Sequence, residues 1–382
     1  MESNLENKSR ICPVPPRSRM GLNLGLRPKP IFMAVSLALI LTMWIRIPLV
    51  IMAPPLISHD PITIDGNANF LNTALLEGWP GDGSPENPFI IDRLEIDLGG
   101  AHDRCISISN TRVSFIISNC NLTGAYYGIS LENVTNAKLV NNTCSSNTIV
   151  GIELRDSYLN TIVNNICSNN NWVGMGFLNS SENTVMNNTC SNNPISGIEL
   201  YDSDSNTIAN NTCSSNGIGG IELGDSYLNT IVNNICNNNW VGIEFLNSSE
   251  NTVMNNTCSS NAIIGIELYD SDSNTIASNT CNNQTTGIFI DSSDLNTIVN
   301  NICNNHSWVG VELHESYECT VMDNNCFNNE FGIALSYSEY NTVAYNYCYY
   351  NIVGFELHSS DSNNFYSNLL FGNEQDISVW WG

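Results

Sequence analysis

The chain has 382 residues, with 12 Lys and Arg against 37 Asp and Glu, which gives a net charge of −25 at pH 7. Seven of the basic residues lie in residues 1–46, whereas residues 156–382 contain 24 acidic residues and no Lys or Arg. Nucleic acids and anionic lipids are bound through cationic side chains, so the composition excludes both as partners of the body of the chain. It is compatible with neutral glycans and with cations.

Residues 31–53 form an apolar segment that directly follows the basic residues 1–30. The positive charge before this segment predicts that residues 1–30 stay in the cytoplasm while the body crosses the membrane. Residues 31–45 alone have the length of a signal-peptide core, but the extension beyond Arg46 reaches the ~20 residues that span a bilayer. We expect a single-pass anchor in the cell membrane with an extracytoplasmic body, or a secreted body if the signal is cleaved; Met20 is an alternative start.

Residues 54–104 precede the repeats and are expected to form an N-terminal cap and the first strands. Residues 69–78 (NFLNTALLEG) predict a short helix with Asn69 at its N-cap. Such a helix would cover the open end of a repeat core, whose unpaired strand edge otherwise invites aggregation. The turn-rich residues 79–88 lead into an expected strand at residues 89–91.

Residues 105–382 repeat one pattern every 22 or 23 residues. A glycine recurs at this interval from Gly128 to Gly354 and opens a short alternating run such as GIEL, which is followed by a second run of the form N-T-I-x-N-N-x-C. Short strands in each repeat, without a helix-length segment between them, are typical of a β-solenoid. We therefore expect an all-β fold, a right-handed parallel β-helix of about 12–13 coils in which equivalent residues stack in columns ~4.8 Å apart.

A longer unit of three coils is duplicated within these repeats. Residues 177–191 are identical to residues 245–259, and residues 197–209 are identical to residues 265–277. A single active site would be expected to make its own coil differ from the others, so the repetition argues against catalysis in the duplicated coils.

One column consists of asparagines that recur once per coil, directly before the Thr of the second run. Asn tolerates the left-handed conformation of a bend, and its amide can bond to the equivalent amide in the coils above and below. We interpret the column as a structural ladder that satisfies buried polar groups. Its members are Asn160, Asn183, Asn206, Asn229, Asn251, Asn274 and Asn296.

A second column consists of cysteines. Equivalent side chains point the same way and lie one coil apart, whereas a disulfide needs Cβ atoms ~3.8 Å apart that face each other. A buried apolar column of thiols accounts for the pattern, with partial disulfide pairing or a thiolate metal site as alternatives; the metal site lacks nearby cations and a C-x-x-C motif. The column comprises Cys144, Cys167, Cys190, Cys213, Cys236, Cys258, Cys281, Cys303, Cys326 and Cys348.

Acidic residues occupy the outward position between the inward Ile and Leu of the GIEL runs, and a D-S-D-S-N segment follows two of these runs. Stacked like charges repel by about 1–3 kcal/mol per pair unless a cation bridges them. We interpret these residues as a solvated acidic face, with weak Ca²⁺ binding as the alternative and no other cofactor expected. The face comprises Glu199, Asp202, Asp204, Glu222, Glu244, Glu267, Asp270 and Asp272.

The coils of residues 105–379, with their G-I-x-L and S-x-x-N-T-I-x-x-N-x-C runs, resemble the NosD-type parallel β-helix family. This resemblance implies the fold named above and a family that includes periplasmic copper-protein maturation factors, carbohydrate-binding or sugar-hydrolase repeats and archaeal surface proteins. The copper role does not transfer, because no ligand motif maps onto these residues. The five His residues form no cluster along the chain; they are His59, His102, His306, His314 and His358.

We expect a non-enzymatic cell-surface protein that serves in envelope structure, adhesion or the binding of neutral glycans, and we predict no catalytic residue. The alternative is a polysaccharide-active hydrolase with paired carboxylates such as Asp202 with Asp204 or Glu222 with Asp225. A lyase would need basic residues, which residues 156–382 lack. Handling of copper or calcium is a third hypothesis. N-x-S/T sequons such as Asn121 also predict some glycosylation outside the cell.

Overall fold

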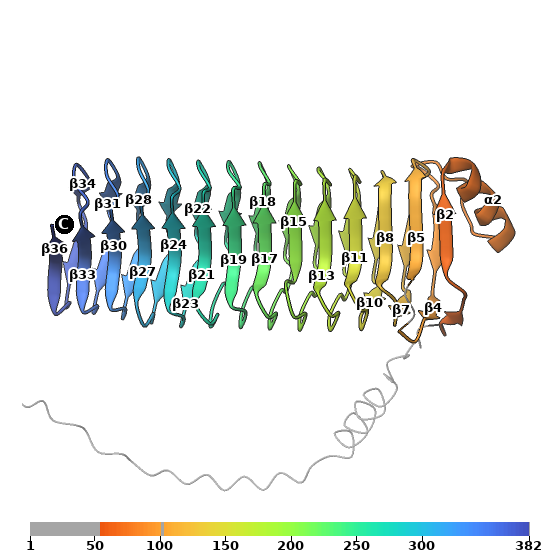
Figure 1. The fold of residues 1–382 in the computed structure, drawn as a ribbon, viewed down its shortest axis with the longest axis horizontal. Coiled ribbons are helices and arrows are strands. Elements are labelled where there is room, and N and C mark those ends of the chain that lie inside the picture. Colours follow the sequence, from red (N-terminus) through yellow and green to blue (C-terminus); the bar gives the residue numbers. More distant parts are fainter. Residues whose placement is uncertain (1–53, 101–102, 382) are drawn as a thin grey trace, which may run out of the picture. The chain divides into compact units, whose positions relative to one another are not determined.

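The computed structural model describes residues 54–100 and 103–381. The basic segment 1–30 and the expected membrane segment 31–53 lie outside these residues. Within the described part, no helix is long and apolar enough to cross a membrane. The chain divides into two units, Met1–Pro54 and Pro55–Gly382, and the second unit is a parallel β-helix closed at one end by helix α2 (Figure 1).

Three parallel sheets run along the axis of this unit, and each coil passes from sheet B to sheet C and then along sheet A. Sheet B has 14 strands. They are β2 (Ile62–Asp65), β5 (Arg104–Thr111), β8 (Tyr127–Val134), β11 (Val150–Arg155), β13 (Val173–Leu178), β15 (Ile198–Tyr201), β17 (Gly219–Gly224), β19 (Val241–Leu246), β21 (Ile264–Tyr269), β24 (Thr286–Asp291), β27 (Val309–His314), β30 (Phe331–Ser336), β33 (Val353–His358) and β36 (Gln375–Trp380).

Sheet C follows sheet B in each coil and has 13 strands, of which most are three residues long. They are β3 (Phe89–Asp92), β6 (Phe115–Ser118), β9 (Ala137–Val140), β12 (Thr161–Val163), β14 (Thr184–Met186), β16 (Thr207–Ala209), β18 (Thr230–Val232), β20 (Thr252–Met254), β22 (Thr275–Ala277), β25 (Thr297–Val299), β28 (Thr320–Met322), β31 (Thr342–Ala344) and β34 (Asn364–Tyr366).

Sheet A forms the third side as two short stretches, which a run of single bridges from Thr143 to Thr280 joins. Its strands are β1 (Ile57–Ser58), β4 (Leu94–Asp97), β7 (Asn121–Thr123) and β10 (Thr143–Cys144), and then β23 (Thr280–Asn282), β26 (Ile302–Asn304), β29 (Asn325–Phe327), β32 (Tyr347–Tyr349) and β35 (Leu369–Phe371). The expected all-β fold, a right-handed parallel β-helix of about 13 coils, is confirmed.

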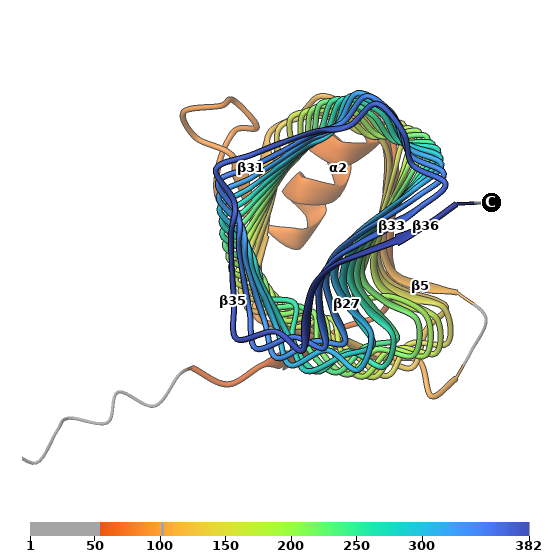
Figure 2. The ribbon, with the colours of Figure 1, turned by 90° about the vertical axis from the view of Figure 1, so that its left-hand side faces the viewer.

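The coils stack in register, so that each position of the repeat forms a column. Ile198 pairs with Ile221 and Leu200 with Leu223, and all four side chains are buried in the core. Viewed along the axis, the coils superimpose around one closed outline (Figure 2). The apolar columns predicted from the repeat therefore form the interior.

Helix α2 (Asn67–Glu77) covers the first coils, as predicted, but its N-cap lies three residues earlier than expected. Gly66 occupies the N-cap, and Asn69 lies inside the helix, where its Oδ1 accepts the backbone N–H of Asp65 at 3.0 Å. The buried Phe70 packs against Phe89 and Phe115, with ring centroids 5.7 and 5.1 Å away. These contacts shield the end of the core.

The asparagine column is buried and forms the expected ladder. Oδ1 of each Asn accepts the backbone N–H of the equivalent residue one coil before it, which is Ala137 for Asn160 and Asn160 for Asn183, both at 2.9 Å. These asparagines do not occupy the left-handed bends, however, because the positive φ angles fall one residue earlier, at Leu159 and Glu182 in these two coils. The members of the column serve as acceptors and donors behind the bend.

A second asparagine ladder runs through Asn142, Asn165 and Asn188, and two further ladders that were not predicted from the sequence run beside it. One begins at Asn147 and continues through Asn170 and Asn193, but Gln284 and His306 replace Asn in its later coils. The other is a column of buried serines, in which the Ser180 hydroxyl accepts the N–H of Ser157. The recurrence of these Asn and Ser residues every 22 or 23 positions is the signal from which both ladders could have been predicted.

The cysteine column lies in the core. All thirteen cysteines in the described residues are buried and free of disulfides. Burial without a neighbouring cation raises the pKa of Cys167, Cys213 and Cys258, and it raises that of Cys105 to about 12. The thiols therefore behave as small apolar groups, and they pack against the glycines that recur once per coil.

Candidate functional site

Three columns of side chains run along the outer face of sheet B. We call the middle column the carboxylate row; it consists of Glu153, Glu199, Glu222, Glu244, Glu267, Glu312 and Glu356, with Gly176, Phe289 and Ala334 between them. An apolar column that includes Val150 and Val173 lies on one side. The column on the other side is mixed and includes Leu178, Tyr201, Gly224 and Leu246.

The carboxylate row is partly buried and not the fully solvated face that we expected. Burial between the two flanking columns raises the pKa of Glu199, Glu244 and Glu267. It raises the pKa of Glu222 to about 7, and the carboxylates of Glu244 and Glu199 add to this effect. Near pH 7 the Glu222 side chain can therefore both donate and accept hydrogen bonds.

Glu222 is the member of the row with the least satisfied carboxylate. Its Oε1 atom is buried and has no hydrogen-bond partner among the described residues. The Ser196 hydroxyl lowers the pKa of Glu222 in part, but the two groups do not reach hydrogen-bonding geometry. A buried oxygen without a hydrogen-bond partner lowers the stability of the fold unless a donor reaches it.

Two hollows lie in this face where glycine replaces a larger residue. The first, of about 260 Å³, lies over Gly176 and is lined by Glu153, Glu199, Leu178 and Tyr201. The second, of about 160 Å³, lies over Gly224 and is lined by Tyr201, Glu199, Glu222, Glu244 and Leu246. Tyr201 separates the two hollows, and both contain half-buried carboxyl groups beside apolar side chains.

Another group of polar side chains lies further along the same face. His314 on β27 contacts Asp291 on β24, with Nδ1 and Oδ1 2.8 Å apart. Glu312 lies two residues before His314 on the same strand, between Phe289 and Ala334 of the neighbouring strands. Burial raises the pKa of Glu312 to about 7. These coils were expected to be part of a uniform rod, and this group was not predicted from the sequence.

The acidic residues of the two D-S-D-S-N segments have structural roles at a bend. Asp202 and Asp270 adopt the left-handed conformation, with φ of 49° and 47°. Asp204 and Asp272 accept the backbone N–H groups of Tyr227 and Asp294 in the next coil, at 2.8 and 2.7 Å. In the described part of the chain, no three His, Cys, Asp or Glu residues converge on a point that a metal ion could occupy.

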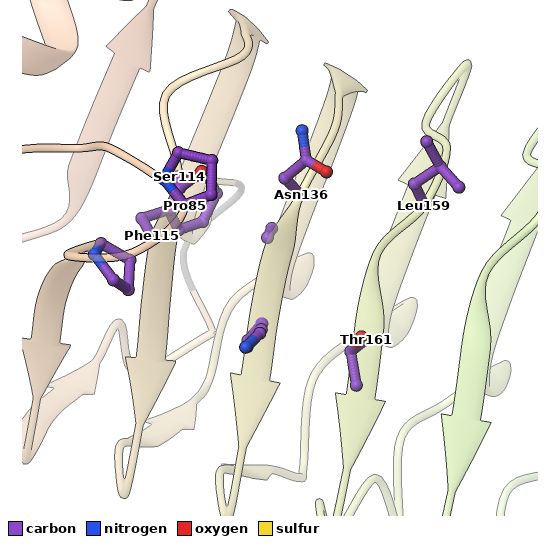
Figure 3. Close-up of a pocket in the computed structure, with 9 residues that line it drawn as sticks. Pro85, Ser114, Phe115, Asn136, Leu159 and Thr161 are labelled. Atoms are coloured by element: carbon purple, nitrogen blue, oxygen red, sulfur yellow. The ribbon is translucent and has the colours of Figure 1, made fainter.

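A third hollow, of about 170 Å³, lies away from the carboxylate row, against the first strands of sheet C. Figure 3 shows Pro85, Ser114 and Phe115 on one side of it and Asn136, Leu159 and Thr161 on the following coils. Its lining includes Lys138 and no carboxyl group, so it offers no pair of groups for acid–base chemistry.

A family model described as "Right handed beta helix region" matches residues 104–258, 196–317 and 241–382. No curated protein matches the chain. Among solved structures, the A-module of the mannuronan C-5 epimerase AlgE6 of Azotobacter vinelandii is 12% identical, with a TM-score of 0.54 and coverage of 85% of this chain and 96% of that one.

Two further proteins are also similar in structure. Pre-mature gene product 12 of bacteriophage phi29 is 12% identical, with a TM-score of 0.64 and coverage of 84% of this chain and 55% of that one. The Dettilon tailspike protein is 14% identical, with a TM-score of 0.50 and coverage of 82% and 64%. At these identities the likeness concerns the fold alone.

Proposed function

The chain belongs to the right-handed β-helix family, and we propose that it is a non-enzymatic rod, displayed outside the cell, that binds neutral glycans on the outer face of sheet B. The observation that carries this proposal is the carboxylate row, whose half-buried carboxyl groups alternate with hollows and with the exposed ring of Tyr201. Sugars present hydroxyl groups that pair with carboxyl groups and C–H faces that pack on aromatic rings.

The charge of the rod restricts the glycan to a neutral one. The five basic residues beyond Arg46 all lie between Arg93 and Arg155, and Arg155 forms an ion pair of 2.8 Å with Glu153. A uronate or sulfated chain would therefore meet acidic groups on this face, where the charge of Arg155 is already compensated by Glu153. Display outside the cell rests on the apolar segment 31–53 and the basic residues before it.

A glycan array tests this proposal with the purified full chain, read once for retention and again for newly released reducing ends. We expect retention of neutral glycans without turnover, and no loss of retention when calcium is chelated. Retention of uronates alone would contradict the proposal, and so would release of reducing ends that depends on an acidic residue. Display is tested by protease treatment of intact cells, which should degrade the rod.

A polysaccharide hydrolase is the second candidate, and the His314–Asp291 contact beside Glu312 favours it. With its pKa raised to about 7, Glu312 can be protonated at neutral pH and can donate a proton to a glycosidic oxygen. His314, oriented by Asp291, can accept a proton from the attacking water. These coils also depart from the duplicated unit, as expected of a coil that holds an active site.

Reducing-end release by the variants Glu312→Gln and His314→Ala separates the two candidates. If the second candidate is right, the unmodified chain hydrolyses a neutral glycan and each variant lowers the rate at least tenfold, without loss of binding. If the rod is non-enzymatic, the unmodified chain and both variants release no reducing ends from the glycans they retain.

A further inference from the structure

We propose that Tyr201 is the central stacking residue of a saccharide site that holds one sugar unit in the hollow on each side of its ring. This inference rests on the proposed glycan binding and adds to it the position of the site and the residues that form it. It follows from three features: the way in which Tyr201 is held, the contents of the two hollows, and the contrast with an identical segment elsewhere in the rod.

Tyr201 is held in place from two directions. Its ring lies over Gly224 of the next coil, where a Cβ atom would be 3.0 Å from its Cδ2 atom. Its hydroxyl donates to the carboxylate of Asp225, which raises the pKa of Tyr201. Nearly half of the side chain is nevertheless exposed, at 47%. An aromatic ring that is fixed yet exposed loses little conformational entropy when a ligand packs on it.

The hollows on the two sides of the ring contain matching polar groups. Glu153 and Glu199 line the hollow over Gly176, and Glu199, Glu222 and Glu244 line the hollow over Gly224. Glu199 therefore borders both hollows. In the second hollow, the carboxyl groups of Glu222 and Glu244 also offer hydrogen-bonding groups to a sugar hydroxyl.

The occupant that fits this site is a neutral saccharide. A second copy of the chain docked on the same face by twofold symmetry would bring together two strongly acidic rods, and residues 156–382 contain no Lys or Arg to compensate the charge. A cationic peptide would require the carboxyl groups to be ionised, whereas their burial favours the neutral form. Hydroxyl groups pair with either form.

An identical segment shows that the site depends on the surrounding coils. Tyr201 and Tyr269 both lie in the sequence GIELYDSDSNTIA, and their exposures are 47% and 44%. In the next coil Tyr201 faces Gly224, whereas Tyr269 faces Asp291. The residue that follows is Asp225 in the first case and Ser292 in the second. Tyr269 is therefore a matched control: its local sequence is the same, but the residues that it faces in the next coil are different.

The test measures binding of neutral linear gluco- and manno-oligosaccharides, from disaccharide to hexasaccharide, to the full chain by calorimetry. We expect Tyr201→Ala to weaken binding of the best oligosaccharide about tenfold and Tyr269→Ala to leave it unchanged. Both variants should unfold at the temperature of the unmodified chain. Equal effects of the two substitutions would overturn the proposal while glycan binding itself stands.

Two filling variants test the hollows with residues that the same columns already use. Gly176→Glu restores the carboxylate row, and Gly224→Leu introduces the side chain found at the equivalent positions 178 and 246. We expect each to weaken binding of the longer oligosaccharides several-fold, and the double variant to abolish it. Unchanged binding by the double variant would overturn the proposal, as would polylysine competing in a salt-dependent manner. No binding of any neutral oligosaccharide by the unmodified chain would overturn the proposed function as well.

Discussion

Oδ1 of Asn183 accepts two hydrogen bonds from Asn160 of the preceding coil, one from its backbone N–H at 2.9 Å and one from its side-chain amide at 3.1 Å. The Asn183 amide in turn donates to the backbone oxygen of Ser157 at 2.9 Å. One buried side chain thus satisfies polar groups at three places in the turn between sheets B and C. The same relationship recurs along the column and ties each coil to the next.

Replacement of one member of this ladder should be costly. Asn183→Ala leaves the Asn160 N–H and the Ser157 oxygen buried without their partners, so we expect a loss of about 3 kcal/mol in the free energy of unfolding. Denaturant titration followed by circular dichroism measures this loss, with the exposed Tyr269→Ala as control. A loss no larger than that of the control would contradict the role of the ladder.

The buried thiols should resist alkylation in the native chain. Burial raises the pKa of Cys105, Cys120 and Cys319 to about 12, and the thiolate is the reactive form. We expect maleimide to modify none of the thirteen cysteines from Cys105 to Cys348 until denaturant is added, as read by mass spectrometry. Modification of several of them in the native chain would show that the column opens to solvent.

The stability of the rod should fall as the pH rises through the range in which Glu222 titrates. Its pKa is raised from 4.5 to about 7 by burial, so between these values the folded chain holds a proton that the unfolded chain has lost. Relative to Glu222→Gln, the unmodified chain should lose about 2 kcal/mol between pH 4.5 and pH 7.5. Unfolding curves of the two chains that keep a constant separation over this range would contradict the burial of Glu222.

His306 should destabilise the rod at acid pH. It replaces Asn in the ladder that begins at Asn147, burial lowers its pKa to about 4, and its Nε2 atom has no hydrogen-bond partner among the described residues. Because the unfolded chain binds a proton near pH 6.5 and the folded chain only near pH 4, stability is lost as the pH falls between these values.

The substitution His306→Asn introduces the residue that the following coils have at this place in the ladder, Asn329 and Asn351, and it removes the loss of stability at acid pH. We expect it to raise the free energy of unfolding by about 2 kcal/mol at pH 5, with a smaller gain at pH 7.5. A gain of equal size at both pH values would assign the effect to packing and not to the titration of His306.

Much of the fold follows from residues whose spacing is regular. Ile198, Leu200 and Ile208 point inward because an alternating strand pattern recurs at a constant interval, and such a pattern has one stable stacking. The bends were predicted less well: the left-handed residues are Leu159 and Asn164, one position before the buried Asn160 and Asn165. The choice of a bend residue depends on the path of the whole coil, which local propensity does not specify.

The candidate site was predicted only in part for the same kind of reason. The sequence predicted that Glu199, Glu222, Glu244 and Glu267 share one outward column, and the structure confirms their register. It did not predict their partial burial, because the side chains of the two flanking columns cover the Glu side chains only when the coils are stacked. The contact between His314 and Asp291 also joins residues 23 positions apart and has no local signature.

The sequence by itself therefore determined the coil, its period, the inward columns and the acidic character of the rod, since each of these depends on a residue's own repeat. Only the tertiary structure decided which of the two tyrosines packs over a glycine of the next coil. Tyr201 and Tyr269 share thirteen residues of local sequence, yet Gly224 lies above one and Asp291 above the other. The physical reason is that in a stacked solenoid the surroundings of an outward side chain are set by the coil above it, about 22 residues away.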